Sequence, residues 1–289
     1  MRYPYSADSG RAGCAELVKR GSERLARCDI RGARHDARAL FLYVSGMTLA
    51  QYAARTGDPV GEDTAVRYHE AIERRAAGEP LQYITGTAPF YGRDFTVNED
   101  VLIPRFDTET LTEAALPYLS GGDRILDLCT GSGCILITLL LEGPPGLKGT
   151  GSDISPGALA CARANAERFG VSADFILSDL FENVTGTYDL ITANPPYIRS
   201  RDIRELDREV RDHEPSLALD GGEDGLIFYR NIAKGAGEHL TGKGVLAFEA
   251  GFDQAEDVAH ILNENGFTDI HIIRDQAGRD RVIIGVKNV

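Results

Sequence analysis

The chain has 289 residues, of which 43% are hydrophobic and 26% charged, and its formal net charge is −13. This composition is typical of a globular protein and excludes a collagen-like or low-complexity chain. The length predicts one large domain and one smaller domain. The longest apolar run, Cys134 to Leu141, is too short to cross a bilayer, so no membrane association is expected.

The charge is distributed unevenly. Residues 1–80 carry 13 Lys and Arg against 11 Asp and Glu, a net charge of +2, whereas the remaining residues carry 18 against 33, a net charge of −15. An acidic main domain repels a phosphate backbone, so no direct nucleic-acid binding is expected. The locally basic stretch from Arg11 to Arg38 is interpreted as a solvated helix face.

Cysteine and histidine usage gives further expectations. Met1 to Gly13 contains no apolar run, which predicts that there is no secretory signal and that the protein is cytoplasmic. Six histidines are scattered without metal-ligand spacing, so no metal site is expected. The cysteines form no CxxC pair and are expected to be reduced thiols: Cys14, Cys28, Cys129, Cys134 and Cys161.

The first 80 residues have helical periodicity. Apolar residues at three- and four-residue spacing predict helices over Cys14–Ala26, Ala33–Ser45 and Thr64–Ala77, with a further short turn over Thr48–Ala54. We therefore predict a small helical domain over residues 1–80. The side chains expected to face inward are Leu17, Val18, Leu25, Leu40, Phe41 and Val44.

The sequence changes character after Pro80. Residues 81–105 are rich in aromatic, β-branched and glycine residues, with a turn signal at Gly92-Arg93-Asp94. This pattern predicts a β-hairpin that links two domains over residues 81–106.

From Asp107 onward, predicted strands and helices alternate, which indicates a Rossmann-like α/β domain over residues 107–289. Repeated βα units favour a mostly parallel sheet with helices on both faces, and the last two strands predict an antiparallel edge. The expected strands are 124–129, 148–154, 174–177, 188–193, 244–249, 269–274 and 281–286; the expected helices are 111–119, 134–141, 156–169, 226–240 and 253–265.

A glycine-containing turn follows the first strand of this domain. The sequence Asp127-Leu128-Cys129-Thr130-Gly131-Ser132-Gly133 leads from a strand into a helix, but Leu136 stands where a dinucleotide fingerprint has its third glycine. A glycine loop at this place lets a ligand approach the backbone closely. Without a lysine, the loop does not suit a triphosphate.

Acidic residues follow the next two strands. Asp153 ends the second strand, about 20 residues beyond the glycine loop, where an acid commonly binds ribose hydroxyls, and Asp179 follows the third strand. Alone, each such acid often only caps the following helix. Together with the glycine loop along one sheet edge, they predict a site for a nucleoside that bears a positive centre.

The fourth strand ends in Asn194-Pro195-Pro196-Tyr197. Two prolines cannot continue a central strand because neither has an N–H for the ladder. An amide side chain, unpaired carbonyl groups and an aromatic ring at this turn suit the binding of a planar group that carries an NH2.

The order of these motifs resembles that of the class I S-adenosylmethionine-dependent methyltransferases that modify planar amino groups. Within them, the chain from Gly78 onward is similar to the PrmC/HemK family, which methylates the glutamine side-chain amide in the Gly-Gly-Gln motif of peptide-chain release factors. The motifs that carry this resemblance are GEPLQYITG (78–86), LIPRFDTE (102–109), DLCTGSG (127–133), NPPYI (194–198), HEPSLAL (213–219) and GGEDGL (221–226).

The resemblance implies roles for individual residues. The amide of the substrate is held by Asn194, Pro195, Pro196 and Tyr197, with Asn194, Pro195 and Tyr197 taking part in catalysis. S-adenosylmethionine is bound, with S-adenosylhomocysteine as product and no metal, by Cys129, Thr130, Gly131, Ser132, Gly133, Asp153, Asp179, Leu180 and Asn194. The chain departs from the family at two positions, with Cys129 where a glycine is frequent and Phe106 where proline is usual.

Some alternatives remain open from the sequence. Tyr197 packs on the substrate amide or is a core tyrosine with a paired hydroxyl group, and Glu214 is interpreted as part of a surface ion pair. The chain as a whole is a release factor methyltransferase, another NPPY methyltransferase acting on adenine or on a ribosomal protein, or a non-catalytic binding module on the same fold.

Overall fold

The computed structural model describes residues 12–288, which form two compact units. One unit contains the chain up to Gly86 together with the short segment Arg208–His213, and the other contains Thr87–Asp207 and the chain from Glu214 onward. Residues 1–11 lie outside the described residues. They include most of the segment from which no signal sequence was expected, and the first residue of the basic stretch, Arg11. No helix among residues 12–288 combines the length and apolar character that a membrane span requires.

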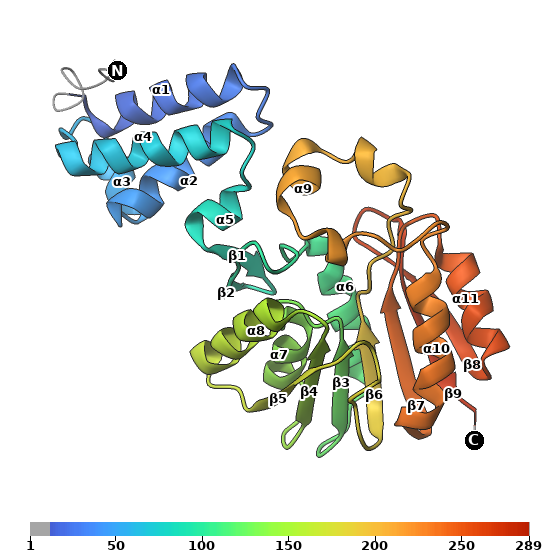
Figure 1. The fold of residues 1–289 in the computed structure, drawn as a ribbon. Helices are drawn as coiled ribbons and strands as arrows, with labels where there is room; N and C mark the ends of the chain where they lie inside the picture. Colours follow the sequence, from blue (N-terminus) through green and yellow to red (C-terminus); the bar gives the residue numbers. More distant parts are fainter. Residues whose placement is uncertain (1–11, 289) are drawn as a thin grey trace. The chain divides into compact units, whose positions relative to one another are not determined.

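The first unit, which we call the helical unit, contains no strand among its described residues (Figure 1). Two predicted helices have the ends that periodicity indicated, and Thr48 caps the third by accepting a hydrogen bond from the Gln51 N–H. The helices are α1 (Cys14–Ala26), α2 (Ala33–Ser45), α3 (Leu49–Ala54), α4 (Glu62–Ala76), α5 (Leu81–Thr85) and α9 (Arg208–His213).

A buried arginine joins three parts of the helical unit. Arg75 on α4 donates to the Asp36 carboxylate on α2 at 2.8 Å and to the Glu79 carbonyl at 3.1 Å, and it forms an ion pair with Glu209 on α9 at 2.7 Å. A buried guanidinium group requires several partners of this kind because it cannot lose its charge. Five of the six predicted inward residues are buried in the hydrophobic core of this unit, and Val44, which is partly buried, packs against the same core.

The predicted hairpin is present but shorter than expected. Residues 81–85, which the predicted hairpin over residues 81–106 included, form the helix α5 instead, which begins after Pro80 and is followed by Gly86 in a left-handed conformation at φ 74°. Proline before a helix and glycine after it are the usual punctuation of a helix. The paired strands are β1 (Thr87–Phe90) and β2 (Arg93–Thr96).

The turn of the hairpin is also one residue earlier than predicted. Tyr91 and Gly92 both have positive φ, at 49° and 73°. This is the geometry of a two-residue turn whose twist matches that of the flanking strands. Arg93 and Asp94 therefore belong to β2.

The second unit, which we call the sheet unit, contains a seven-stranded sheet in the order β5-β4-β3-β6-β7-β9-β8 (Figure 1). The predicted fold class is confirmed: the strands are mostly parallel, and β9 runs antiparallel to both of its neighbours. The strands are β3 (Arg124–Leu128), β4 (Lys148–Asp153), β5 (Ala173–Leu177), β6 (Tyr188–Ala193), β7 (Leu240–Glu249), β8 (Phe267–Arg274) and β9 (Asp280–Lys287).

Helices cover both faces of this sheet. Strands β3, β6, β7 and β9 contribute residues to two separate cores: one contains α6, α7, α8 and the hairpin, and the other contains α10 and α11. The helix predicted to start at residue 111 begins at Phe106 instead. The helices are α6 (Phe106–Ala115), α7 (Cys134–Glu142), α8 (Pro156–Phe169), α10 (Ile227–His239) and α11 (Ala255–Glu264), with short 3₁₀ helices at Leu116–Tyr118, Asp202–Glu205 and Ser216–Ala218.

The packing of α1 against α4 predicts that Gly21→Ala destabilises the helical unit. A methyl group at Gly21 would approach the Tyr68 hydroxyl oxygen to 2.2 Å and Ile72 Cδ1 to 2.9 Å. We expect the free energy of unfolding to fall by about 1–3 kcal/mol in urea titrations. Gly237→Ala on α10 is the control, because nothing lies within 4 Å of its added carbon, and it should increase stability by about 0.5–1 kcal/mol. Equal effects of the two substitutions would contradict this packing.

Candidate active site

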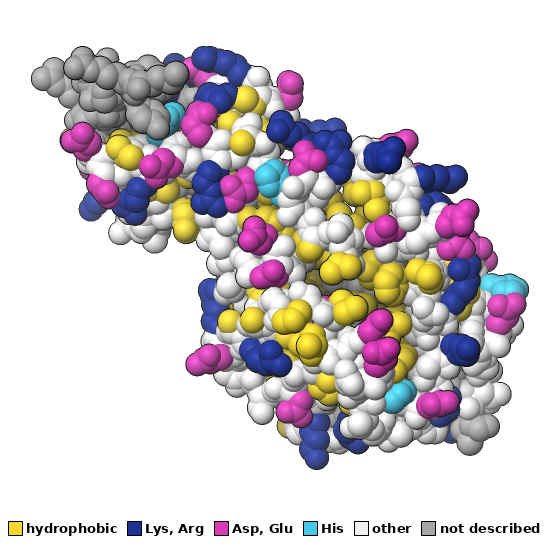
Figure 2. Space-filling view, viewed as in Figure 1, with side chains coloured by type: hydrophobic (Ala, Val, Ile, Leu, Met, Phe, Trp, Pro, Cys, Tyr) yellow, Lys and Arg dark blue, Asp and Glu magenta, His cyan; other side chains and the backbone are white. Residues whose placement is uncertain are grey.

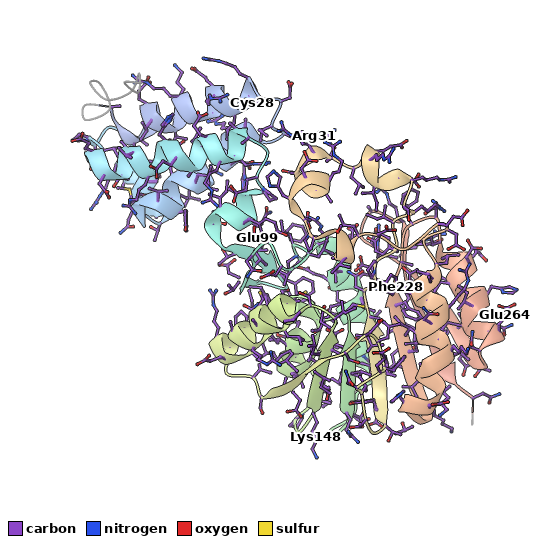
Figure 3. All side chains as sticks on the ribbon, viewed as in Figure 1. Cys28, Arg31, Glu99, Lys148, Phe228 and Glu264 are labelled. Carbon is purple, nitrogen blue, oxygen red and sulfur yellow. The ribbon has the colours of Figure 1, made fainter. Side chains whose placement is uncertain are left out.

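Five adjacent parallel strands end at one edge of the sheet unit, and a cavity of about 370 Å³ lies beside the residues that follow four of them, β5, β4, β3 and β6. In Figure 2, apolar side chains gather around a hollow on this unit. Glu99, which follows the hairpin, and Phe228 on α10 both line the cavity and are labelled in Figure 3. The predicted site residues that line it are Cys129, Thr130, Gly131, Ser132, Asp153, Asp179, Leu180, Asn194 and Pro196; the predicted residues that do not are Gly133, Pro195 and Tyr197.

The glycine loop after β3 takes a left-handed backbone conformation at three positions. Gly131 and Gly133 have φ of 54° and 77°, and Cys129 has φ of 55°. This conformation costs a residue with a side chain about 1–2 kcal/mol, which explains why a glycine is favourable where Cys129 stands. A side chain at Gly133 would meet Ile137 and Ala162 at 3.0–3.2 Å, so this glycine permits close packing of α7 against α8.

A buried carboxylate, from Asp127, accepts hydrogen bonds that hold the glycine loop in place. Asp127, the fourth residue of β3, accepts hydrogen bonds from the Thr130 hydroxyl at 2.6 Å and from the Thr192 hydroxyl on β6 at 2.7 Å. Burial raises the pKa of Asp127 to about 6. No role for Asp127 was predicted from the DLCTGSG motif, although a charged residue within an apolar strand is a signal of such a function.

Asp153 connects the glycine loop to the start of α8. One carboxylate oxygen accepts from the Gly131 N–H and the other from the Ser155 N–H, both at 2.9 Å. Each oxygen has a second lone pair, so Asp153 has further capacity to accept from ligand hydroxyl groups. Burial raises the pKa of Asp153.

The cavity is strongly acidic. Its lining includes four carboxylates, from Glu99, Asp100, Asp153 and Asp179. Arg105 is the one Lys or Arg among the lining residues, and Glu214 neutralises it. The cavity therefore suits a ligand with positive charge. Residues 12–288 contain no group of three or more His, Cys, Asp or Glu side chains that could hold a metal ion.

The Asn194-Pro195-Pro196-Tyr197 turn follows β6 at the same edge. Asn194 is half-buried, and its Nδ2 donates to the Thr108 hydroxyl oxygen at 3.4 Å. Tyr197 packs against the hydrophobic core that includes α10 and α11, and its hydroxyl group donates to Glu249 Oε1 at 3.4 Å. This geometry favours the alternative in which Tyr197 is a core tyrosine with a paired hydroxyl group. Burial raises its pKa.

The motif from Gly221 to Leu226 packs against the backbone of this turn. The Gly221 N–H donates to the Ile198 carbonyl at 2.8 Å, and a side chain at Gly221 would lie 2.7 Å from Tyr197 Cα. A side chain at Gly225 would lie 2.4 Å from the Tyr197 carbonyl oxygen. Only glycine allows two backbone segments to come this close.

The ion pair predicted for Glu214 is present, but the prediction that Glu214 lies on the surface was wrong. Its side chain is 1% exposed, pairs with Arg105 and accepts a hydrogen bond from the Ile103 N–H at 3.2 Å. Glu214 therefore fixes the segment that precedes α6 to the segment that contributes Pro215 and Leu217 to the cavity. The sequence could not show this because the partners are more than a hundred residues apart.

Comparisons with known proteins identify relatives of this chain. Residues 16–86 match the family described as the PrmC N-terminal domain, and residues 106–213 match the methyltransferase small domain. The chain is 42% identical over 277 residues to "Release factor glutamine methyltransferase" of Agrobacterium fabrum, which covers 93% of this chain and 95% of that protein. It is 41% identical over 284 residues to the protein of that name from Rhodospirillum rubrum, covering 97% and 87%.

A solved structure shows the same fold. A methyltransferase from Pyrococcus furiosus aligns with a TM-score of 0.53 and 20% identity, over 69% of this chain and 91% of that chain. At this level of identity, the similarity concerns the fold alone.

The left-handed conformation of Cys129 predicts an unusual order of stability between two variants. Cys129→Gly should be more stable than Cys129→Ala by about 1 kcal/mol in urea titrations, because glycine adopts this conformation without a steric cost. Cys134, at the first position of α7, is the matched control. There, alanine should be the more stable replacement, because glycine loses more entropy in a helix. The same order at both positions would contradict the strained loop.

Proposed function

The chain belongs to the family of release factor glutamine methyltransferases, and on this premise we propose the reaction and the substrate in detail. The protein transfers a methyl group from S-adenosylmethionine to the side-chain amide nitrogen, N5, of the glutamine in the Gly-Gly-Gln motif of peptide-chain release factors. The observation that carries this proposal is the shared cavity: Asn194 and Pro196 line the same cavity as the glycine loop and Asp153. We further propose that the protein acts in the cytoplasm, which agrees with its five free thiols.

The lining residues fit S-adenosylmethionine. Its sulfonium and ammonium groups are positively charged, and four carboxylates with a single neutralised arginine line the cavity. The free lone pairs of Asp153 accept from the ribose hydroxyl groups, and Asp179 and Leu180 lie beside the adenine. Residues 129–132, which line the cavity, surround the methionine portion. When bound, S-adenosylmethionine supplies an electrophilic methyl group.

The chain's own contribution is mainly to position the substrate. A carboxamide nitrogen is a weak nucleophile because its lone pair is delocalised into the carbonyl group. Asn194 Oδ1 and the Pro195 carbonyl accept the two N–H bonds and so direct the nitrogen toward the methyl group. Such positioning contributes about 7–11 kcal/mol in well-oriented reactions, and the acidic lining stabilises positive charge that develops on the nitrogen.

Labelled S-adenosylmethionine tests the proposal. We expect label on an intact release factor, mass spectrometry placing it on the Gly-Gly-Gln glutamine, and none on a factor in which asparagine replaces that glutamine. A ribosomal protein and double-stranded DNA are offered in parallel. Preferential labelling of either would refute the proposal, and so would the absence of transfer to all three.

Asn194→Ala tests the role of the amide side chain. Because Asn194 binds the substrate nitrogen in the reacting geometry, we expect kcat to fall by about 100-fold, the order seen when one oriented polar group is removed from an active site. The dissociation constant of S-adenosylmethionine, measured by calorimetry, should change little. A variant with near-normal single-turnover rates would show that Asn194 does not orient the amide.

The helical unit is proposed to bind the release factor. Three of its large apolar side chains are exposed: Tyr43 at 54%, Leu49 at 55% and Val66 at 51%. Tyrosine is enriched at protein interfaces, and burying exposed apolar surface against a partner is favourable. Deleting the unit is a poor test, because Arg208–His213 would lose its partners.

Substitution of these three residues by glutamine keeps the helices and removes the apolar surface. We expect kcat/KM for an intact release factor to fall at least tenfold, mainly through KM, because the contacts lie away from the reacting atoms. A short Gly-Gly-Gln peptide serves as the control substrate and should be methylated at the rate of the unaltered protein. Unchanged kinetics with the intact factor would assign the helical unit another role.

A further inference from the structure

Glu249 is a buried acidic residue to which the proposed reaction gives no role. It ends β7 and is 1% exposed, and its Oε1 accepts from the Tyr197 hydroxyl at 3.4 Å. Its Oε2 has no well-formed hydrogen bond among residues 12–288. A buried carboxyl oxygen in this state is unfavourable unless a nearby donor can turn toward it, and such groups concentrate at functional sites.

A second residue connects Glu249 to the substrate amide site. Thr108 is buried on α6, and its hydroxyl oxygen accepts from Asn194 Nδ2. The Thr108 hydroxyl also faces the Glu249 carboxyl group. A hydroxyl group has one proton to donate, so when its oxygen accepts from Asn194, its proton points to Glu249. The result is a directional chain from Asn194 through Thr108 to Glu249, which Tyr197 joins from the other side.

The direction of this chain determines which way the Asn194 amide faces. An ionised carboxylate only accepts hydrogen bonds. It therefore makes Thr108 a donor toward Glu249, and Asn194 must then present its NH2 group to Thr108 and leave Oδ1 for the cavity. A protonated Glu249 donates instead, and Thr108 can then donate to Asn194 Oδ1. That reversal turns the amide and presents NH2 to a substrate that needs an acceptor.

We propose that Glu249 is a positioning residue that, through Thr108 and Tyr197, holds the Asn194 amide with its oxygen toward the substrate nitrogen. This role rests on the proposed glutamine methylation and deepens it. It also explains why Thr108 and Tyr197, neither of which needs to touch the cofactor, stand in the motifs around the cavity.

The surroundings of Glu249 bring the pKa of its carboxyl group close to neutral pH. Burial raises its pKa to about 7, Arg281 on β9 opposes this rise, and Asp107 on α6 adds to it. Arg281 is itself engaged with Asp107 at 3.1 Å and with the Ala250 carbonyl at 3.0 Å. The other titratable groups that face Glu249 are Tyr197, Tyr229 and Cys134. Because the ionised form is the one that orients Asn194, activity should fall as the pH decreases through this pKa.

The full-length Glu249→Gln variant tests the proposal, because it keeps the shape and removes the charge. We expect kcat with a release factor to fall about 10–100-fold, the range for a buried polar partner removed, with an unchanged dissociation constant for S-adenosylmethionine. The decline of kcat on the acidic side of pH 7 should be present in the unaltered protein and absent in this variant. A wild-type kcat with the acidic decline retained would overturn the role.

Two substitutions of Thr108 separate positioning from folding. Thr108→Ser keeps the hydroxyl group and should restore most of the rate, whereas Thr108→Val should lose as much as Glu249→Gln, and the double variant should lose no more than either. A fully active Thr108→Val would overturn the proposal even if Glu249→Gln failed to fold. Failure of the unaltered protein to methylate any release factor would instead refute the proposed function, so the two outcomes are distinct.

Discussion

The hydrogen bonds of Asp127 are the interaction on which the site depends. This carboxylate is fully buried and accepts from Thr130 in the glycine loop and from Thr192 on β6. A buried carboxylate is costly unless it is hydrogen-bonded, and hydroxyl donors to a charged acceptor are among the stronger partners. Since β6 leads directly into Asn194, a single side chain holds the loop after β3 and the turn after β6 in one arrangement. The glycine loop and the turn that carries Asn194 are thereby held in a fixed relation to each other.

Glycines extend this rigidity outward. Gly221 and Gly225 let one backbone segment lie directly against the Pro196-Tyr197 peptide, where any side chain would collide with main-chain atoms. Gln254 fastens the same place from the start of α11 by donating to the Tyr197 carbonyl at 3.0 Å. The turn that presents Asn194 therefore has little freedom, which suits catalysis by positioning.

Local patterns predicted most of the sheet unit. Tyr188–Ala193 and Pro156–Phe169 have the ends that periodicity and proline placement indicated, and the shared edge of parallel strands brought Asp153 and Asn194 to one cavity. The roles of Glu249 and Glu214 were beyond such reasoning. Each is a carboxylate whose partners come from distant segments, and nothing near it in the chain distinguishes a buried acid from a solvated one. For the same reason, the sequence did not predict that residues 208–213 belong to the helical unit. The role of Glu209 is recognisable only from its ion pair with Arg75.

That short segment has a consequence for biosynthesis. The chain passes between the two units three times, after Gly86, before Arg208 and after His213. During translation, the first helices leave the ribosome early, and domains generally fold in that order. Here Glu209, one of the three partners of Arg75, is still unmade at that stage, so the leading unit reaches its final form only after most of the sheet has been synthesised. A gene fusion that exchanged residues 1–86 alone would carry Arg75 without Glu209. A recombination that keeps this unit intact must therefore also include residues 208–213, from the middle of the gene.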